Sequence, residues 1–398
     1  MSWEKIKWSD FCDISPKVLL AKGAKYSFIP MDIVDGGIKH VLYPEEKIYT
    51  GGGTKFCDGD TIFARITPCL EDGKIAKIKN LKNEIGFGST EFFVFRAKDN
   101  ISDPDFVYYM AKTETIRQPA IKSMVGASGR QRADKRVVEN ILVQKVPLRV
   151  QRKIASILSA YDDLIENNLR RIKLLEEAAQ LIYKEWFVNF KFPGYENTKF
   201  VNGLPEGWGK IQLKEIGKII TGKTPDTNNE DYFGGDVPFI RIPDMHNKVY
   251  IINTSVTLSE KGLSIQSNNT LPPNTILVSC IGSVGIVALT SCYSQTNQQI
   301  NAIIPFQKEY VYFLYFYMKS IKLKLEGLGS NGATMHNVNK NKFSNILLII
   351  PKVNTIHMFY ELVINNFNKI FLLEKQVIKL MQARDLLLPK LMSGEIEV

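Results

Sequence analysis

The stretch that decides the fold is residues 154–186, IASILSAYDDLIENNLRRIKLLEEAAQLIYKEW. Positions spaced alternately four and three residues apart in this stretch are Ile154, Leu158, Tyr161, Ile165, Asn168, Ile172, Leu175, Ala179, Ile182 and Trp186. Nine of these ten side chains are apolar or aromatic. An apolar repeat of this period, sustained over several heptads, is typical of a coiled-coil seam. At about 1.5 Å per residue, it predicts a helix roughly 50 Å long.

A second series with the same spacing lies near the end of the chain, at Ile356, Phe359, Val363, Asn366, Ile370, Leu373, Val377, Leu380, Arg384 and Leu387. Two such helices in one chain should pair with each other. We therefore expect a helix-pairing seam that contains Ile154, Leu158, Tyr161, Ile165, Asn168, Ile172, Ile356, Val363, Asn366, Ile370 and Val377. Its two asparagines either fix the register of pairing or are tolerated near a solvated edge.

The chain also contains an internal repeat, because short matches recur in the same order at a nearly constant offset of 205 residues. Trp3, Lys5 and Ile6 recur as Trp208, Lys210 and Ile211, and Asn140-Ile141-Leu142 recurs as Asn345-Ile346-Leu347. Thr61-Ile62 matches Thr275-Ile276 at an offset of 214, which predicts a local insertion in one of the two halves. Short apolar runs bounded by turn residues precede each long helix and indicate strands.

We therefore predict an α+β fold: two similar mixed α/β domains, separated by two long antiparallel coiled-coil helices, in a pseudo-twofold internal repeat. Segments rich in proline and glycine mark the boundary between the halves. The expected parts are a first domain at 1–148, a first spacer helix at 149–190, a linker at 191–207, a second domain at 208–351, and a second spacer helix with a C-terminal tail at 352–398.

Composition limits the classes of function. The chain has 398 residues, 44% of them hydrophobic and 23% charged, which excludes wholesale disorder. Its net charge of +10 favours a polyanionic partner. Five scattered cysteines and four histidines argue against a metal site or a disulfide framework. No apolar segment approaches the ~18 residues that span a bilayer, so we expect a cytoplasmic protein without a membrane partner.

Motifs for catalysis are missing, whereas signals for nucleic-acid binding are present. We find no GxGxxG fingerprint, no GxxxxGK[ST] phosphate loop and no Asn-Pro-Pro-aromatic motif, so we assign no catalytic residue and no cofactor. Residues 122–153 hold nine basic and two acidic side chains, a local net charge of +7. Such a segment can follow several phosphates, and Arg and Gln can make paired hydrogen bonds to base edges. The alternative interpretation is a solvated basic face.

Several segments carry a resemblance to a known family. Residues 51–74, GGGTKFCDGDTIFARITPCLEDGK, followed by GSTEF at 88–92, resemble the target-recognition domain of the specificity subunit of type I restriction–modification enzymes. In the second half, TGKTP at 221–225, YFGGDVPFI at 232–240, QQIN at 298–301 and LLPKLMSGE at 387–395 resemble another such domain and its closing helix. PLRVQRKI at 147–154 resembles the start of the family's helical spacer. The second spacer, from Pro351, lacks the Gln-Arg pair of the first.

The resemblance implies that each domain recognises one half of a bipartite site in double-stranded DNA, while the helical spacer sets the gap. Two modification subunits would methylate adenine with S-adenosylmethionine, and restriction subunits would cleave DNA with ATP and Mg. This chain would then be a non-catalytic specificity subunit. Two alternatives remain: a self-contained DNA methyltransferase or nuclease with a divergent site, and a coiled-coil scaffold for other proteins.

Turn position and side-chain type select the candidate DNA contacts, which are distributed over both halves. In the first domain they are Lys55, Thr67, Lys74, Ser89, Thr90, Arg130, Gln131 and Arg132. In the second domain they are Lys223, Thr224, Arg241, Ser283, Gln298, Gln299, Asn331, Thr334, His336 and Asn337.

Overall fold

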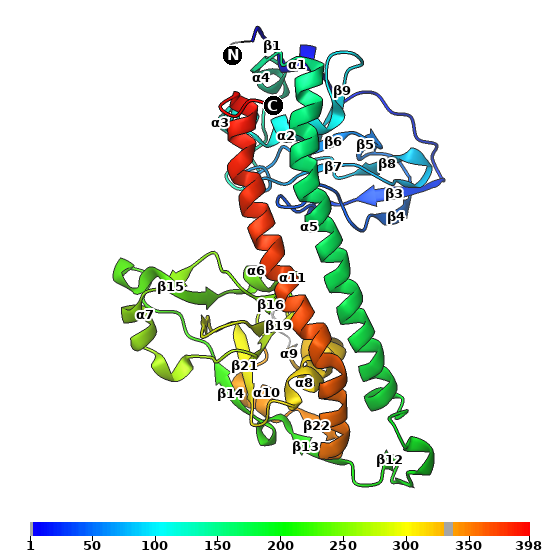
Figure 1. Ribbon diagram of the computed structural model, residues 1–398, viewed down its shortest axis with the longest axis vertical. Helices are drawn as coiled ribbons and strands as arrows, with labels where there is room; N and C mark the ends of the chain where they lie inside the picture. The colour runs from blue at the N-terminus through cyan, green and yellow to red at the C-terminus, as the bar shows by residue number, and fades with distance from the viewer. Residues whose placement is uncertain (1–2, 330–336) are drawn as a thin grey trace. The chain divides into compact units, whose positions relative to one another are not determined.

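The computed structural model describes residues 3–329 and 337–398, and its helices and strands are drawn in Figure 1. The chain divides into two compact units. The first contains residues 1–167 and 377–398, and the second contains residues 168–376. Each unit therefore combines one mixed α/β domain with segments of both long helices.

The first domain contains two main sheets. One has the strand order β2-β9-β6-β7, formed by Cys12–Ile14, Phe92–Ala97, Thr61–Ala64 and Ile75–Lys77. The other has the order β4-β3-β8-β5, formed by Glu45–Ile48, Lys25–Ile29, Ile85–Gly88 and Thr54–Cys57. A separate antiparallel pair joins β1 (Lys5–Lys7) to β10 (Leu142–Gln144). The helices of this domain are α1 (Trp8–Phe11), α2 (Pro104–Lys112), α3 (Glu114–Lys122) and α4 (Lys135–Glu139).

The second domain repeats much of this plan. Its largest sheet has the order β14-β21-β18-β19-β16, formed by Gly217–Thr221, Ile300–Pro305, Ile276–Ser279, Val287–Thr290 and Tyr250–Ile251. A smaller sheet has the order β17-β15-β20, formed by Thr257–Leu258, Phe233–Ile240 and Gln295–Thr296. The pair β13 (Gly209–Gln212) and β22 (Leu347–Ile350) corresponds to β1 and β10. The helices are α6 (Ile242–Met245), α7 (Glu260–Ser264), α8 (Tyr310–Ser320), α9 (Lys322–Gly329) and α10 (Lys340–Ser344). A short hairpin, β11 (Phe200–Val201) with β12 (Leu204–Pro205), precedes the domain.

Strand register confirms the internal repeat. Ile6 faces Val143 in β1–β10, and Ile211 faces Leu348 in β13–β22, so both partners shift by the predicted offset of 205. The strand order β2-β9-β6-β7 also recurs as β14-β21-β18-β19. Thr61 begins β6 and Thr275 directly precedes β18, as expected from the local match at offset 214. The two halves are therefore copies of one α+β plan, as predicted.

The long helices are α5 (Leu148–Tyr183) and α11 (Val353–Ser393), and α5 continues into a π-helical turn at Lys184–Val188. In the first unit, Asp162 of α5 forms an ion pair with Arg384 of α11, and Leu158 shares a core with Leu388. The two helices are antiparallel here, because the later residue of α5 pairs with the earlier residue of α11.

The same direction holds in the second unit. Asn168 Nδ2 donates to Gln376 Oε1 over 3.4 Å, while the ring of Tyr183 lies 6.3 Å from that of Phe359. The predicted antiparallel pairing is therefore confirmed within each unit.

The residues assigned to the seam are buried or half-buried side chains of the two long helices. Buried positions are Ile154, Leu158, Ile165, Asn168, Ile172, Ile356, Val363, Ile370 and Val377. Tyr161 and Asn366 are half-buried. Arg384 occupies a position of the predicted seam and is 2% exposed, so a charged group is buried there. A buried charge lowers the stability of the folded state unless other groups compensate it. Arg384 therefore needs polar partners.

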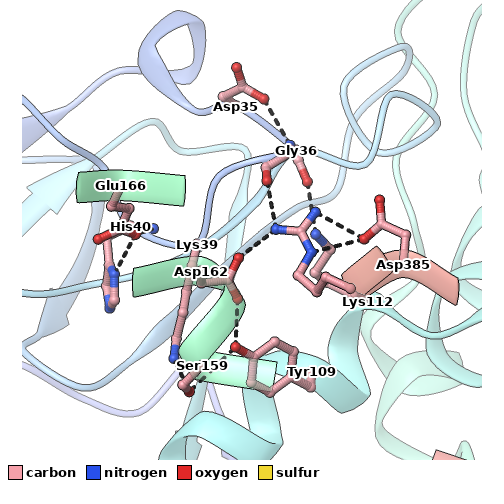
Figure 2. Close-up of polar contacts among 12 residues, drawn as sticks. Asp35, Gly36, Lys39, His40, Tyr109, Lys112, Ser159, Asp162, Glu166 and Asp385 are labelled. Carbon is pink, nitrogen blue, oxygen red and sulfur yellow. Dashed lines mark hydrogen bonds and ion pairs between the residues drawn. The ribbon is translucent and has the colours of Figure 1, made fainter. Parts of the chain in front are cut away.

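A polar network holds the first domain against the helices of its unit. Figure 2 shows Ser159 and Asp162 of α5, Tyr109 of α2 and the loop at Gly36 converging on one another. The Tyr109 hydroxyl donates to Asp162, and the Arg384 guanidinium donates to the Gly37 carbonyl oxygen over 2.8 Å. The buried charges of Asp162 and Arg384 therefore each meet hydrogen-bond partners, as stable burial of a charge requires.

One glutamate in each unit also anchors a strand edge to a long helix. In the first unit, Glu166 of α5 accepts from the backbone N–H and from Nδ1 of His40. In the second unit, Glu374 of α11 accepts from the backbone N–H groups of Val249 and Tyr250, over 2.8 and 2.9 Å. The anchored segments correspond, because the Lys39 carbonyl accepts from Lys77 as the Val249 carbonyl accepts from Leu289. Each domain is thus fixed to a helix by a glutamate side chain that accepts hydrogen bonds from otherwise open backbone donors.

Candidate nucleic-acid interface

Three loops of the first domain meet at the ends of β6 and β9. The Arg65 N–H donates to the Glu91 carbonyl oxygen over 3.0 Å, and the Ala133 N–H donates to the Arg65 carbonyl oxygen over 2.8 Å. The Thr67 N–H donates to the Gln131 carbonyl, while the Gln131 N–H donates back to Thr67 Oγ1. We name residues 65–67, 89–91 and 130–133 the first loop junction.

An arginine–glutamate cluster occupies the first loop junction. Arg132 donates from Nε and Nη2 to the Glu91 carboxylate over 2.7 to 3.0 Å, and Arg65 Nε donates to the same group over 3.3 Å. The hydrogen bond from Arg132 holds the pKa of Glu91 below its ordinary value, even though desolvation acts against it. Glu91 is therefore ionised at neutral pH and fixes the position of two cationic side chains.

The second domain contains a corresponding second loop junction, formed by residues 280–282, 297–299 and 337–338. The Cys280 N–H donates to the Gln299 carbonyl over 2.8 Å, and the Val338 N–H donates to the Cys280 carbonyl over 2.9 Å. Ile281 bridges to Asn337 as Ile66 bridges to Arg132. These two backbone hydrogen bonds and the bridge are thus the same in both domains. The side chains at these positions differ. The second domain has Cys280, Gln299 and Asn337 where the first has Arg65, Glu91 and Arg132, respectively.

The structure brings together six of the eight contacts predicted for the first domain. Thr67, Ser89, Thr90, Arg130, Gln131 and Arg132 all belong to the first loop junction, and Arg130 and Thr90 are exposed. The other two predicted residues have separate surroundings. Lys55 Nζ lies 5.4 Å from the centre of the Tyr49 ring, and Lys74 Nζ donates to the Met31 carbonyl over 3.0 Å.

In the second domain the predicted residues group around the loop at 297–299. Thr224 Oγ1 donates to Gln298 Oε1 over 2.6 Å, and the Lys223 N–H donates to the Thr296 carbonyl. Gln299 and Asn337 belong to the second loop junction, and Ser283 follows it directly.

Arg241 precedes α6 and donates from Nη2 to Ser255 Oγ over 2.8 Å. The predicted contacts Asn331, Thr334 and His336 lie outside the residues that the structure describes.

Arg65 and Glu91 are members of the first loop junction that the sequence prediction missed. Glu91 lies inside the GSTEF motif at 88–92, but an acidic side chain does not suggest a contact with polyanionic DNA. Its partner Arg132 is 41 positions away, so only the folded chain reveals their pairing. The position of Glu91 directly after Ser89 and Thr90 was the available signal.

Both loop junctions offer hydrogen-bond donors and acceptors suited to recognition of a polar surface. Among residues 3–329 and 337–398, no group of three or more His, Cys, Asp or Glu side chains is arranged to hold a metal ion. Within those same ranges, none of the helices has the length and apolar character needed to cross a membrane.

Comparisons with known proteins agree with this duplicated geometry. The family described as "Type I restriction modification DNA specificity domain" matches residues 1–177 and again residues 205–378. The type I restriction enzyme HindI specificity subunit of Haemophilus influenzae is 33% identical over 404 residues, covering 85% of this chain and 86% of the relative. The MjaIX specificity subunit of Methanocaldococcus jannaschii is 26% identical over 318 residues, covering 74% and 69%.

A solved structure supports the fold. The crystal structure of a type I restriction–modification system S subunit from M. genitalium is similar with a TM-score of 0.55 and 17% identity. The similarity covers 98% of this chain and 96% of that one.

Proposed function

Since this chain belongs to the type I restriction–modification DNA specificity family, we propose that it is the sequence-recognition subunit of a type I restriction–modification complex. Each domain binds one half of a bipartite site in double-stranded DNA through its loop junction. The paired helices set the gap between the halves, as dimer geometry sets half-site spacing in other DNA-binding proteins.

The observation that carries this proposal is the duplication of the loop junction. The same backbone hydrogen bonds present polar side chains at the same place in both domains, although those side chains differ. A conserved frame with different donors and acceptors suits two domains that recognise different bases. The basic segment 122–153, which contains Arg130 and Arg132, adds the positive charge that phosphate binding requires.

The proposed partners supply the chemistry. Two modification subunits methylate adenine with S-adenosylmethionine, and restriction subunits use ATP and Mg to cleave. The specificity subunit itself is non-catalytic and binds none of these cofactors. Similarity to specificity subunits favours this assignment over a self-contained methyltransferase or nuclease and over a coiled-coil scaffold.

The proposal is tested by co-purifying the full chain with modification subunits and supplying S-adenosylmethionine and a library of random duplexes. We expect adenine methylation at one bipartite motif with a constant gap. The chain alone serves as the control, and it should neither methylate DNA with S-adenosylmethionine nor cleave it with magnesium. Methylation without sequence preference would refute the proposal, and activity of the chain alone would favour the enzyme alternative.

A further inference from the structure

The guanidinium of Arg132 is held in one orientation. It has five N–H donors in a fixed planar arrangement. Nε and one N–H of Nη2 are directed at Glu91, and Nη1 donates to the Arg130 carbonyl oxygen over 3.4 Å. One N–H on each terminal nitrogen therefore has no partner in the part of the chain that the structure describes.

The Arg132 side chain is accessible to solvent, whereas Glu91, which holds it in place, is mostly buried. The Arg132 side chain is 44% exposed, whereas the Glu91 side chain is 18% exposed. Arg65 holds Glu91 from a second direction over 3.3 Å. Because Glu91 is fixed on both sides, it fixes Arg132 in turn, and the arginine loses little conformational entropy when it binds a ligand.

We propose that Arg132 recognises a guanine in the first half-site and that Glu91 is the positioning residue that presents it. This inference rests on the proposed function and specifies the base that one domain recognises. Guanine offers two acceptors, O6 and N7, on its major-groove edge, and paired donors of an arginine match them. A base with a donor at the corresponding position leaves one of these hydrogen bonds unmade.

The second domain carries a different side chain in the same frame. Asn337 is exposed and occupies the position of Arg132, while Gln299 replaces Glu91. An asparagine amide places an N–H donor beside a carbonyl acceptor, and these match N7 and N6–H of adenine. A neutral amide also needs no carboxylate to hold it, which agrees with the replacement of Glu91 by Gln299. The two domains therefore present a guanine contact and an adenine contact at equivalent positions.

The first test compares variants of the full chain, each co-purified with modification subunits, on duplexes that carry every base at each position of the wild-type motif. We expect Arg132→Ala to lose roughly ten- to hundredfold of the preference for guanine at one position of the first half-site. Preferences in the second half-site should stay unchanged. Arg130→Ala is the matched control, since this neighbouring exposed arginine should weaken binding to all sequences alike.

Glu91→Gln separates positioning from general support of the fold. The variant keeps the shape of the side chain but removes its charge, so Arg132 loses its orientation. We expect a smaller loss of preference at the same guanine and a midpoint of thermal unfolding close to that of the wild type. Equal weakening at every base position, or a large fall of the unfolding midpoint, would contradict the positioning role.

Asn337→Ala tests the corresponding contact in the second domain, and it should relax one adenine position of the second half-site only. Unchanged base preferences in both Arg132→Ala and Asn337→Ala, beside a wild-type complex that methylates a bipartite motif, would overturn the inference and leave the proposed function intact. A wild-type complex without any motif would instead refute the proposed function.

Discussion

Asp162 and Arg384 form a deeply buried ion pair in the first unit. Their side chains are 1% and 2% exposed. Arg384→Ala leaves the carboxylate of Asp162 buried without its cationic partner. Breaking such a pair from one side costs about 3–5 kcal/mol, because the remaining charge has lost its compensation. We expect a loss of unfolding free energy of this size, measured by urea denaturation followed by circular dichroism.

The matched control for this prediction removes both charges. Asp162→Leu combined with Arg384→Met should recover most of the lost stability, since no uncompensated charge remains. Glu177→Ala, which removes a surface pair with Lys173 at 3.8 Å, should change stability by less than about 0.5 kcal/mol. An Arg384→Ala variant as stable as this surface variant would show that the buried pair is unimportant.

Glu374 makes the stability of the second unit depend on pH. Burial raises the pKa of this carboxyl from its ordinary 4.5 to about 7, although the N–H groups of Val249 and Tyr250 act in the opposite direction. The folded state therefore binds the proton more tightly than the unfolded state. The resulting stability is fully present below pH 4.5 and is lost as pH rises through about 7. This dependence changes the free energy of unfolding by on the order of 3 kcal/mol. In Glu374→Gln it should be absent, which is measured by thermal unfolding at several pH values.

Glu166 provides the opposite case in the first unit. Desolvation raises its pKa, but the hydrogen bonds and charge of His40 outweigh that effect, and the pKa lies below its ordinary value. Its stabilising contribution is therefore present above the unfolded pKa and is lost as pH falls through the folded pKa. Glu166→Gln should flatten the acidic side of the stability profile. If both glutamine variants kept the wild-type profile, neither anchor would titrate as described.

At the scale of the helices, the proposed function predicts that spacer length determines the gap in the DNA site. Seven residues inserted after Asn168 in α5, and seven inserted before Gln376 in α11, preserve the heptad pattern and the pairing of these two side chains. The insertion lengthens each helix by about 10 Å, which corresponds to roughly three base pairs of duplex. We expect the methylated motif to keep both half-sites while its gap grows by that amount.

The control places the same seven residues in α5 alone. The two helices then lose their common register, and we expect a lower unfolding midpoint together with loss of methylation. A doubly lengthened chain that still methylates the original motif would contradict the proposed role of the helices.

The long helices and the repeat could be predicted from sequence because both are carried by local or periodic patterns. Ile154 to Trp186 shows the heptad spacing directly, and the offset between Ile6 and Ile211 reappears as strand register. These signals depend on spacing along the chain, which folding preserves.

The charged contacts could not be predicted in the same way. Arg384 looks like an interruption of an apolar seam until Asp162, 222 positions away, is seen beside it. Glu374 falls between seam positions, and its partners are backbone N–H groups that carry no sequence signal. The Glu91–Arg132 pair likewise depends on the meeting of two loops. Sequence therefore indicated where the loops lie but left open which side chains hold one another.

For the whole molecule, the net charge of +10 makes DNA binding depend on salt, and the placement of the charge makes that dependence testable. Lys122 and Arg130 are exposed members of the basic segment 122–153. If each contacts a phosphate, replacing both with alanine should lower the slope of log affinity against log salt by roughly two. The slope is measured by fluorescence anisotropy of a duplex carrying the motif, at several salt concentrations.

Lys369→Ala with Lys379→Ala removes the same charge from exposed positions of α11 and should leave the slope unchanged. A localised phosphate-binding surface responds only to the residues that form it. If the slope fell equally in both double variants, the salt dependence would follow the total charge of the chain instead.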